Sequence, residues 1–226
     1  MQYHRKLEEE LNEEAIHWVY NRVFRKDHQA PGFALITFGK AIGTGALRKN
    51  MVALKSGLAG RSMRAFGKEL AYYWLARFDQ QNTTRFHRDN APRDAYLVLG
   101  YEPTAVESKL LFADHHQFVT ENNLTSDEYY RRYNPLFQEG EEHLAPYTTE
   151  LDPLDKQAYH IVVINNSELD SQQTWGVLHK AVMKRPVKDQ ARIVNSMMLY
   201  LKPPEAPQQI SPAAELNFLH TDKVNR

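Results

Sequence analysis

The chain contains no cysteine among its 226 residues. Disulfide bonds, thiolate nucleophiles and cysteine-ligated zinc are therefore excluded, and His, Asp and Glu remain as the strong protein ligands for a metal ion. Stability must come from the hydrophobic core. A chain of this length can bury most of its apolar surface in a single domain, which we expect to span residues 1–202.

Net charge is also missing, because 28 Lys and Arg residues balance 28 Asp and Glu residues. The chain has no overall field that would hold a polyanion or a membrane surface, so nucleic acid is not the expected partner. Long apolar runs are absent too. The charged N-terminus does not resemble a signal peptide, and no later stretch reaches the length of a membrane span, which predicts a cytoplasmic protein.

Apolar residues recur at helical spacing in two places in the first third of the chain. The first stripe predicts an amphipathic helix over residues 5–28, ending before Pro31. The second stripe follows a possible Ser62 cap and predicts a helix over residues 62–79. Between them, residues 33–38 are a short apolar run that predicts a strand, and the glycines that follow indicate a loop.

From about residue 84 the pattern changes to short β-prone runs separated by Pro, Asn, Asp and Gly. The runs cover residues 96–101, 109–113, 159–164, 177–183 and 193–201. They predict a mainly β fold with flanking α-helices, in the form of an antiparallel sandwich or barrel built mostly from residues 84–201. Residues 114–146 interrupt the strands as a predicted helical insertion, and residues 203–226 are predicted to form a Pro-rich tail.

The segment around His87 and Asp89 carries the clearest chemical pattern. Side chains two residues apart on a strand project to the same side, so these two can share one metal ion while Arg88 points away. The spacing by itself is common, and a turn or capping role is the alternative. His179 is the candidate third ligand, because a strand distant in sequence can lie beside this one in a sheet. Two His and one carboxylate form the facial triad of non-haem Fe(II) oxygenases.

Arg192 follows His179 at the head of the next predicted strand. Its guanidinium could offer two parallel hydrogen bonds to a carboxylate. Structural alternatives stay open for both residues: His179 could be a partly buried His bonded to a backbone carbonyl, and Arg192 could pair with Asp189 or another carboxylate.

The order His87-x-Asp89, His179 and Arg192 over a run of short strands resembles the Fe(II)- and 2-oxoglutarate-dependent oxygenases, over about residues 33–201. The resemblance implies a double-stranded β-helix, which is a jelly-roll or cupin-like barrel. It implies Fe(II) bound by His87, Asp89 and His179, with 2-oxoglutarate as cosubstrate. Arg192 would bind the distal carboxylate of 2-oxoglutarate, and Ser196, which shares its strand parity, would face the same cavity.

The implied activity is that of a dioxygenase, in which oxidative decarboxylation of 2-oxoglutarate is coupled to hydroxylation of a small-molecule or peptide substrate. The chain departs from the family in lacking a Gly-rich turn that ends in Gly-Ser-His. A long polar insertion follows residues 112–118 instead and would form a substrate lid, so the substrate class cannot be transferred.

Two other functions are alternatives to the oxygenase. A catalytically inactive cupin-like barrel could bind a ligand or a protein partner, with its His and Asp residues serving only the structure. A metal-dependent hydrolase is disfavoured because no carboxylate-rich second metal site is evident.

Three other groups of polar residues are expected to have structural roles. Asp114, His115 and His116 form a rival metal cluster, but adjacent residues on a strand face opposite sides, which favours a surface loop. His160 is expected to be a hydrogen-bonded core residue, and residues 165–167 to form a turn.

Overall fold

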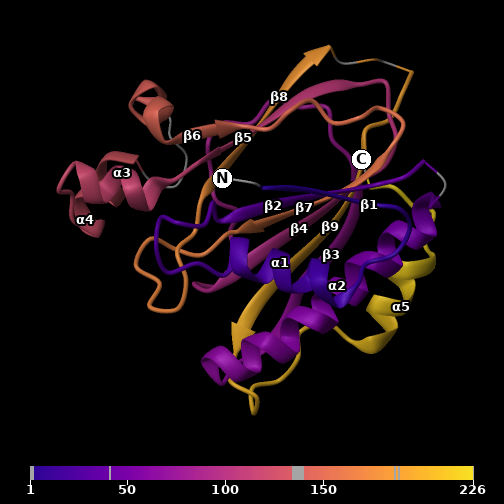
Figure 1. The fold of residues 1–226 in the computed structure, drawn as a ribbon, viewed down its shortest axis with the longest axis horizontal. Coiled ribbons are helices and arrows are strands. Elements are labelled where there is room, and N and C mark those ends of the chain that lie inside the picture. Colours follow the sequence, from indigo (N-terminus) through magenta and orange to yellow (C-terminus); the bar gives the residue numbers. More distant parts are fainter. Residues whose placement is uncertain (1–2, 41, 134–139, 186, 188, 226) are drawn as a thin grey trace.

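The computed structural model describes residues 3–40, 42–133, 140–185, 187 and 189–225. Two β-sheets make up its centre (Figure 1). The larger sheet has the order β1-β2-β7-β4-β9-β3, with strands β1 His4–Leu7, β2 Phe33–Phe38, β3 Glu69–Asp79, β4 Ala95–Tyr101, β7 Tyr159–Asn165 and β9 Ile193–Lys202. The smaller sheet has the order β6-β5-β8, with strands β5 Glu107–Ala113, β6 Thr148–Glu150 and β8 Leu178–Arg185. All neighbouring pairs are antiparallel except β1 and β2.

The smaller sheet continues beyond β8 through residues 83–87. The amide of Thr84 donates to the carbonyl of Ala181 at 2.9 Å, and two further backbone hydrogen bonds join His87 to His179. The segment that contains the predicted metal ligands therefore runs beside β8, on the side of that strand opposite β5.

Apolar side chains fill both faces of the larger sheet. Helices α1 (Glu13–Val23) and α2 (Gly43–Phe66) cover one face, and the smaller sheet lies over the other (Figure 1). Within β7, Ile161 and Val163 belong to the core beneath the helices, whereas Val162 and Ile164 belong to the core between the sheets. Strands buried on both faces are expected to be continuously apolar, as these runs are in the sequence.

The predicted mainly β fold with flanking helices is confirmed, and each strand predicted from the sequence has a counterpart, with β2 spanning residues 33–38 as expected. The insertion is helical in its described part. It contains α3 (His115–Glu121), α4 (Ser126–Tyr133) and a 3₁₀ helix, η1 (Glu141–Tyr147), while residues 134–139 of the predicted insertion lie outside the described residues. Among the described helices, none combines the length and apolarity needed to cross a bilayer.

The helix predicted over residues 62–79 is wrong. Helix α2 begins at Gly43, in the predicted glycine loop, and ends at Phe66, where Gly67 adopts a left-handed φ of 63°. The chain then continues as β3. A register shift between Tyr72 and Trp74 in the pairing with β9 interrupts the period-two alternation. The aromatic residues on either side of this bulge are therefore spaced as they would be on one face of a helix, although they lie in a strand.

The Pro-rich tail predicted for residues 203–226 is only partly correct. After the prolines, Ser211 accepts a hydrogen bond from the amide of Ala214 and caps helix α5 (Pro212–His220). Phe218 of this helix is buried in the core beneath the helices. Asn225 then forms a parallel bridge with Phe78 of β3, so the segment docks on the domain.

Candidate metal centre

His87, Asp89 and His179 converge at one point between the sheets. Each offers one ligand atom, and these three atoms lie within 4.8 Å of one another. Nε2 of His87 lies 3.4 Å from Oδ1 of Asp89, and Nε2 of His179 lies 4.0 Å from Oδ2 of the same carboxylate. In the part of the chain that the structure describes, no other group of three His, Asp or Glu residues is arranged in this way.

The backbone brings the two imidazoles together. The amide of His87 donates to the carbonyl of His179 at 3.0 Å, and the amide of His179 donates back at 2.9 Å. Residues directly opposite one another in an antiparallel pair carry their side chains on the same face. The ring centroids are accordingly 4.2 Å apart, and Asp89, two residues after His87, joins them on that face.

Hydrogen bonding and burial orient the two imidazoles. Nδ1 of His87 donates to the carbonyl of Arg85 at 2.8 Å, which leaves Nε2 as the nitrogen that faces the site. Burial lowers the pKa of His179 to about 4 despite the nearby Asp89, so this ring is neutral at pH 7. Nδ1 of His179 is buried with no hydrogen-bond partner among the described residues.

The carboxylate of Asp89 adds a negatively charged oxygen donor to the two imidazole nitrogens. Burial would raise the pKa of Asp89, but the hydrogen bond from His87 and the neighbouring positive charges lower it below its usual value. For His87, burial opposes protonation, but the hydrogen bond to Asp89, the charge of Asp89 and the backbone hydrogen bonds with Arg85 and His179 together outweigh burial and raise the pKa. Binding of a divalent cation would displace a proton shared by this pair.

A cavity of about 100 Å³ extends from the three residues into the space between the sheets. Most of its lining is apolar and comes from both sheets: Leu97, Leu99, Leu110, Phe112, Val162 and Ile164. Gln80 and Tyr101 also line it. These last two residues connect the cavity to Arg192.

Arg192 lies behind Gln80 and Tyr101 and is 2% exposed. Its guanidinium carbon is 4.7 Å from the centroid of the Tyr101 ring, Nε donates to Oγ of Ser108 at 3.1 Å, and Nη1 donates to both oxygens of Gln80 at 3.2 Å. Nη2 is buried without a partner, and no carboxylate among the described residues forms an ion pair with this guanidinium. Pairing with Asp189 is therefore not observed.

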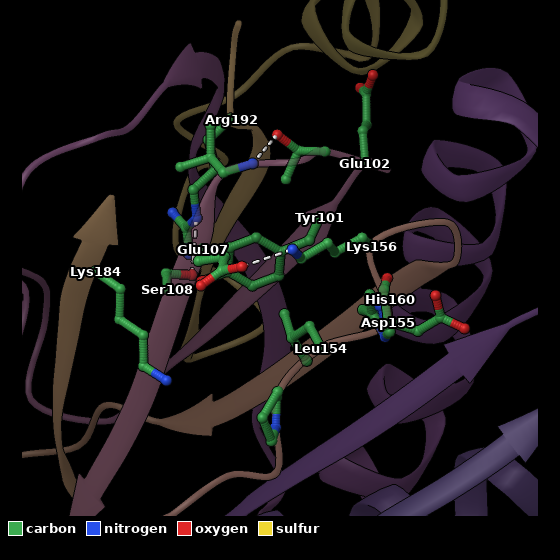
Figure 2. Close-up of a pocket in the computed structure, with 13 residues that line it drawn as sticks. Tyr101, Glu102, Glu107, Ser108, Leu154, Asp155, Lys156, His160, Lys184 and Arg192 are labelled. Carbon is green, nitrogen blue, oxygen red and sulfur yellow. Dashed lines mark hydrogen bonds and ion pairs between the residues drawn. The ribbon is translucent and has the colours of Figure 1, made fainter. Parts of the chain in front are cut away.

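A second cavity, of about 270 Å³, adjoins Arg192 on another side (Figure 2). Tyr101 lines both cavities, so its ring and the stacked guanidinium form part of the wall between them. The ion pair between Lys156 and Glu107, at 2.6 Å, lies across this second cavity.

The structure does not bring Ser196 to the cavity beside His87. Its position in β9 has the parity of Val194 and Met198, which belong to the core between the sheets. Its hydroxyl oxygen accepts a hydrogen bond from Nε1 of Trp74 at 3.3 Å. Contact of Ser196 with a cosubstrate stays a prediction.

The surface-loop prediction for residues 114–116 is wrong. Asp114 caps helix α3 and pairs with Arg25 at 2.5 Å, and this cap turns His115 and His116 into the interior. The His116 ring stacks on Trp175. Predicting a strand or loop here missed the cap.

His160 is buried and hydrogen bonds with Thr37 and with the carbonyl of Asp155, as expected of a core residue.

Five residues that support the site were missed in the sequence. Gln80, Tyr101 and Ser108 surround the guanidinium of Arg192, whereas Arg88 and Asn166 hold the backbone of Asp89. Strand parity could have identified Tyr101, which shares a face with Leu97 and Leu99. The run at 165–167 was predicted only as a turn, although all three of its side chains are fully buried.

Comparisons with known proteins gave similarities only at the level of structure. No family model matches the chain, and no curated protein matches its sequence. Solved structures that resemble it include Fe(II)- and 2-oxoglutarate-dependent enzymes. One is the Kdo hydroxylase KdoO, a non-haem Fe(II) α-ketoglutarate-dependent dioxygenase in complex with succinate and Fe(III), at 10% identity and a TM-score of 0.43, covering 96% of this chain and 95% of that chain.

Other structures of the same hydroxylase contain α-ketoglutarate with Fe(III), or cobalt(II). A variant of the iron and α-ketoglutarate-dependent endoperoxidase NvfI is similar at 11% identity and a TM-score of 0.37, covering 80% of this chain and 82% of that chain. TM-scores below 0.5 do not establish a shared fold, so a function for this chain must rest on its own side chains.

Proposed function

We propose that the chain is a non-haem dioxygenase that binds Fe(II) and 2-oxoglutarate and couples oxidative decarboxylation of 2-oxoglutarate to hydroxylation of a small-molecule or peptide substrate. One observation carries the proposal. Three donors of the facial-triad type lie within 4.8 Å of one another beside a cavity, and residues that line this cavity hold a buried Arg192, which has no counter-ion among the described residues.

The strand order supports a double-stranded β-helix. The chain passes from β3 to residues 83–87, then through β4, β5, β6, β7, β8 and β9, and these segments belong to two antiparallel ladders: β3-β9-β4-β7 and residues 83–87 with β8-β5-β6. Eight strands in two antiparallel sheets are typical of a jelly roll. Strands β1 and β2 extend the larger sheet beyond this unit.

The protein residues would divide the work between holding the metal and placing the cosubstrate. The metal ion would be held by Nε2 of His87, Nε2 of His179 and a carboxylate oxygen of Asp89. Bound Fe(II) would supply the redox chemistry that dioxygen activation requires.

Arg192 would bind the distal carboxylate of 2-oxoglutarate. A buried guanidinium without an ion-pair partner is costly, and a carboxylate ligand would relieve that cost. Ser108 and Gln80 hold the guanidinium in place, and the aliphatic lining of the cavity would exclude water around the ligand.

The alternative of an inactive binding module is less well supported. An arginine residue retained only for structure is expected to have its buried nitrogens hydrogen bonded. Nη2 of Arg192 is buried without a partner in the described residues, and Arg192 belongs to the proposed site.

An anaerobic absorption titration tests the proposal. Adding Fe(II) and then 2-oxoglutarate should produce the weak visible metal-to-ligand band of the chelate, and absence of the band in folded protein would exclude this function. His179→Ala should lose the band. His143→Ala changes an exposed histidine in η1 and should keep it.

A further inference from the structure

We propose that Asn166 is a positioning residue for the metal-binding carboxylate, and that together with Arg88 it fixes the backbone of Asp89 and thereby sets the metal affinity. The inference rests on the proposed function only in requiring that His87, Asp89 and His179 bind a metal. Asn166 itself would not touch the ion.

The side-chain amide of Asn166 forms a two-point contact with Asp89. The amide nitrogen of Asp89 donates to Oδ1 of Asn166 at 2.9 Å, and Nδ2 of Asn166 donates to the carbonyl of Asp89 at 3.1 Å. The side-chain amide of Asn166 therefore bonds to the N–H and the C=O of Asp89, as the backbone of a neighbouring strand would. Asn166 is 0% exposed, and its own backbone nitrogen donates to the carbonyl of Ala95 at 2.8 Å.

Asp89 needs such a partner because the ladder beside β8 stops at His87. The pair formed by His87 and His179 is an isolated bridge, and Asp89 lies two residues beyond it. Among the described residues, the backbone groups of Asp89 bond to Asn166 and Arg88. These contacts therefore hold the backbone from which the carboxylate extends toward His87 and His179.

Arg88 points away from the metal ligands, as strand parity predicts, and closes the turn from the other side. Its Nη1 donates to the carbonyls of Asp89, Ala91 and Asn166 at 3.2 to 3.3 Å. Its Nη2 donates to Oε1 of Glu168 at 2.5 Å. One planar guanidinium thus joins the turn after His87 to the segment that carries Asn166.

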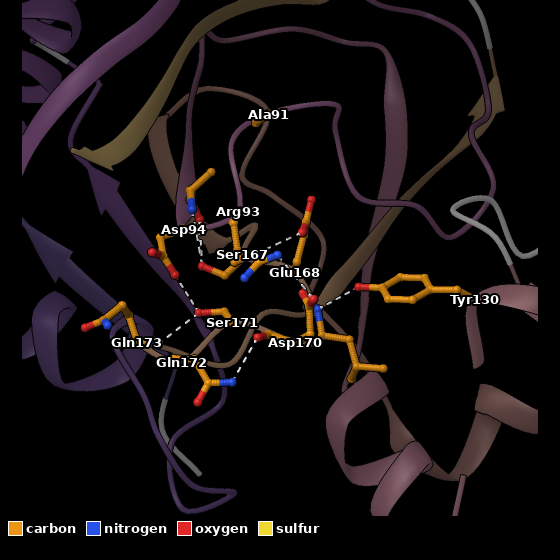
Figure 3. Close-up of polar contacts among 12 residues, drawn as sticks. Ala91, Arg93, Asp94, Tyr130, Ser167, Glu168, Asp170, Ser171, Gln172 and Gln173 are labelled. Carbon is orange, nitrogen blue, oxygen red and sulfur yellow. Dashed lines mark hydrogen bonds and ion pairs between the residues drawn. The ribbon is translucent and has the colours of Figure 1, made fainter. Parts of the chain in front are cut away.

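The loop that bears Asn166 and Glu168 is anchored at several points (Figure 3). Glu168 donates its backbone N–H to the carbonyl of Arg93 at 2.8 Å, and Ser171 Oγ donates to Oδ1 of Asp94 at 2.6 Å. Tyr130 of helix α4 accepts a hydrogen bond from the amide of Leu169 at 3.1 Å. The loop whose Asn166 contacts Asp89 is therefore hydrogen bonded both to the residues before β4 and to helix α4 of the insertion.

Residues that orient a metal ligand without touching the metal typically contribute roughly 10–100-fold to metal affinity. Titration of the metal-free protein with Co(II) alone measures this contribution, and the visible Co(II) spectrum reports on the ligand geometry. Asn166→Ala should lower the Co(II) affinity by roughly 10–100-fold and change that spectrum.

Asn165→Ala is the matched control. Asn165 is equally buried and adjacent, and its amide also makes two hydrogen bonds, to the carbonyl of Val23 at 2.8 Å and from the amide of Ser167 at 3.1 Å. This variant should lose thermal stability to a similar extent but keep the Co(II) affinity and spectrum of the wild type.

Equal Co(II) affinity in wild type and Asn166→Ala, or equal losses in the two Asn variants, would overturn the inference while leaving the metal site in place. Absence of Co(II) binding by the wild type would instead remove the proposed function and this inference together. If Asn166→Ala does not fold, Arg88→Lys keeps the charge but cannot span three carbonyls, and it should weaken Co(II) binding in the same direction. An unchanged affinity in Arg88→Lys would then count against the inference.

Discussion

His87 and His179 are joined by two backbone hydrogen bonds, of 3.0 and 2.9 Å, that hold their imidazole rings 4.2 Å apart. The backbone therefore defines the distance between the two nitrogen donors before any metal arrives. A preformed pair loses little conformational freedom on binding, which favours affinity.

Asp89→Ala should abolish metal binding and leave the fold intact. The substitution removes the only carboxylate of the cluster, so the loss of Co(II) affinity should exceed the roughly 100-fold that loss of an outer-shell partner can cost. Metal titration and thermal unfolding of the variant test both parts. Asp152→Ala, which removes an exposed carboxylate, is the control. Unchanged affinity in Asp89→Ala would remove this residue from the site.

Arg192→Met should weaken 2-oxoglutarate without weakening pyruvate. Pyruvate has the same 2-oxo acid group but lacks the distal carboxylate that we assign to Arg192. The expected loss for 2-oxoglutarate is about 2–5 kcal/mol, typical of truncating one partner of a buried charge pair. Binding of both acids to the metal-loaded protein under anaerobic conditions measures the difference. Equal losses for the two acids would assign Arg192 to structure.

His116→Phe should make the free energy of unfolding less dependent on pH between pH 7 and 4.5. Burial lowers the pKa of His116 to about 2, with smaller contributions from His115 and Arg25 that outweigh the opposing Asp114. Below pH 6.5 the unfolded chain binds a proton at this position, whereas the folded chain does not until about pH 2. The free energy of unfolding therefore falls as the pH drops, by up to about 1.4 kcal/mol per pH unit for this group.

Phenylalanine retains the stacking on Trp175 but cannot titrate. Urea unfolding of wild type and His116→Phe between pH 7 and 4.5 should give a shallower dependence for the variant. Parallel curves would show that the histidine is not held neutral in the folded state.

Gly100→Ala should destabilise the packing of β4 against α2. A Cβ at this position would lie 2.5 Å from Sδ of Met51 and 3.2 Å from Cδ2 of Leu47. Overpacking of this kind costs about 1–3 kcal/mol. A Cβ at Gly60, within α2, would lie 3.8 Å from Nη1 of Arg64, so Gly60→Ala fits without a clash and should raise the free energy of unfolding by about 0.4–1 kcal/mol. Chemical denaturation distinguishes the two, and equal stability of both variants would contradict the packing described.

Local patterns in the sequence predicted most of the strands, but the helix predicted over residues 5–28 is correct only for α1, because residues 4–7 form β1 beside β2. Strand β2 was expected over the residues that form it, because both its faces are buried and its ends are marked by glycines. Strand β3 was missed, since its bulge at Tyr72 and Trp74 depends on pairing with β9 and leaves no period-two pattern. The conformation of residues 69–79 is therefore determined by pairing with a strand distant in sequence.

The cluster formed by His87, Asp89 and His179 was predicted, because a family pattern marks its spacing. The residues that support it were not. Asn166 contacts Asp89 only because β7 ends beside the turn after His87, and no local pattern in the sequence reports that contact. Supporting polar residues of this kind are set by tertiary structure, and sequence parity alone could not separate Ser196 from the residues that line the cavity.

A crystal structure of the protein with Co(II) and 2-oxoglutarate tests the central claim most directly. Anomalous scattering at the cobalt edge locates the ion independently of any model. The account predicts one cobalt bound by His87, Asp89 and His179, with the distal carboxylate of 2-oxoglutarate on Arg192. Cobalt bound elsewhere, or a distal carboxylate that does not contact Arg192, would contradict it.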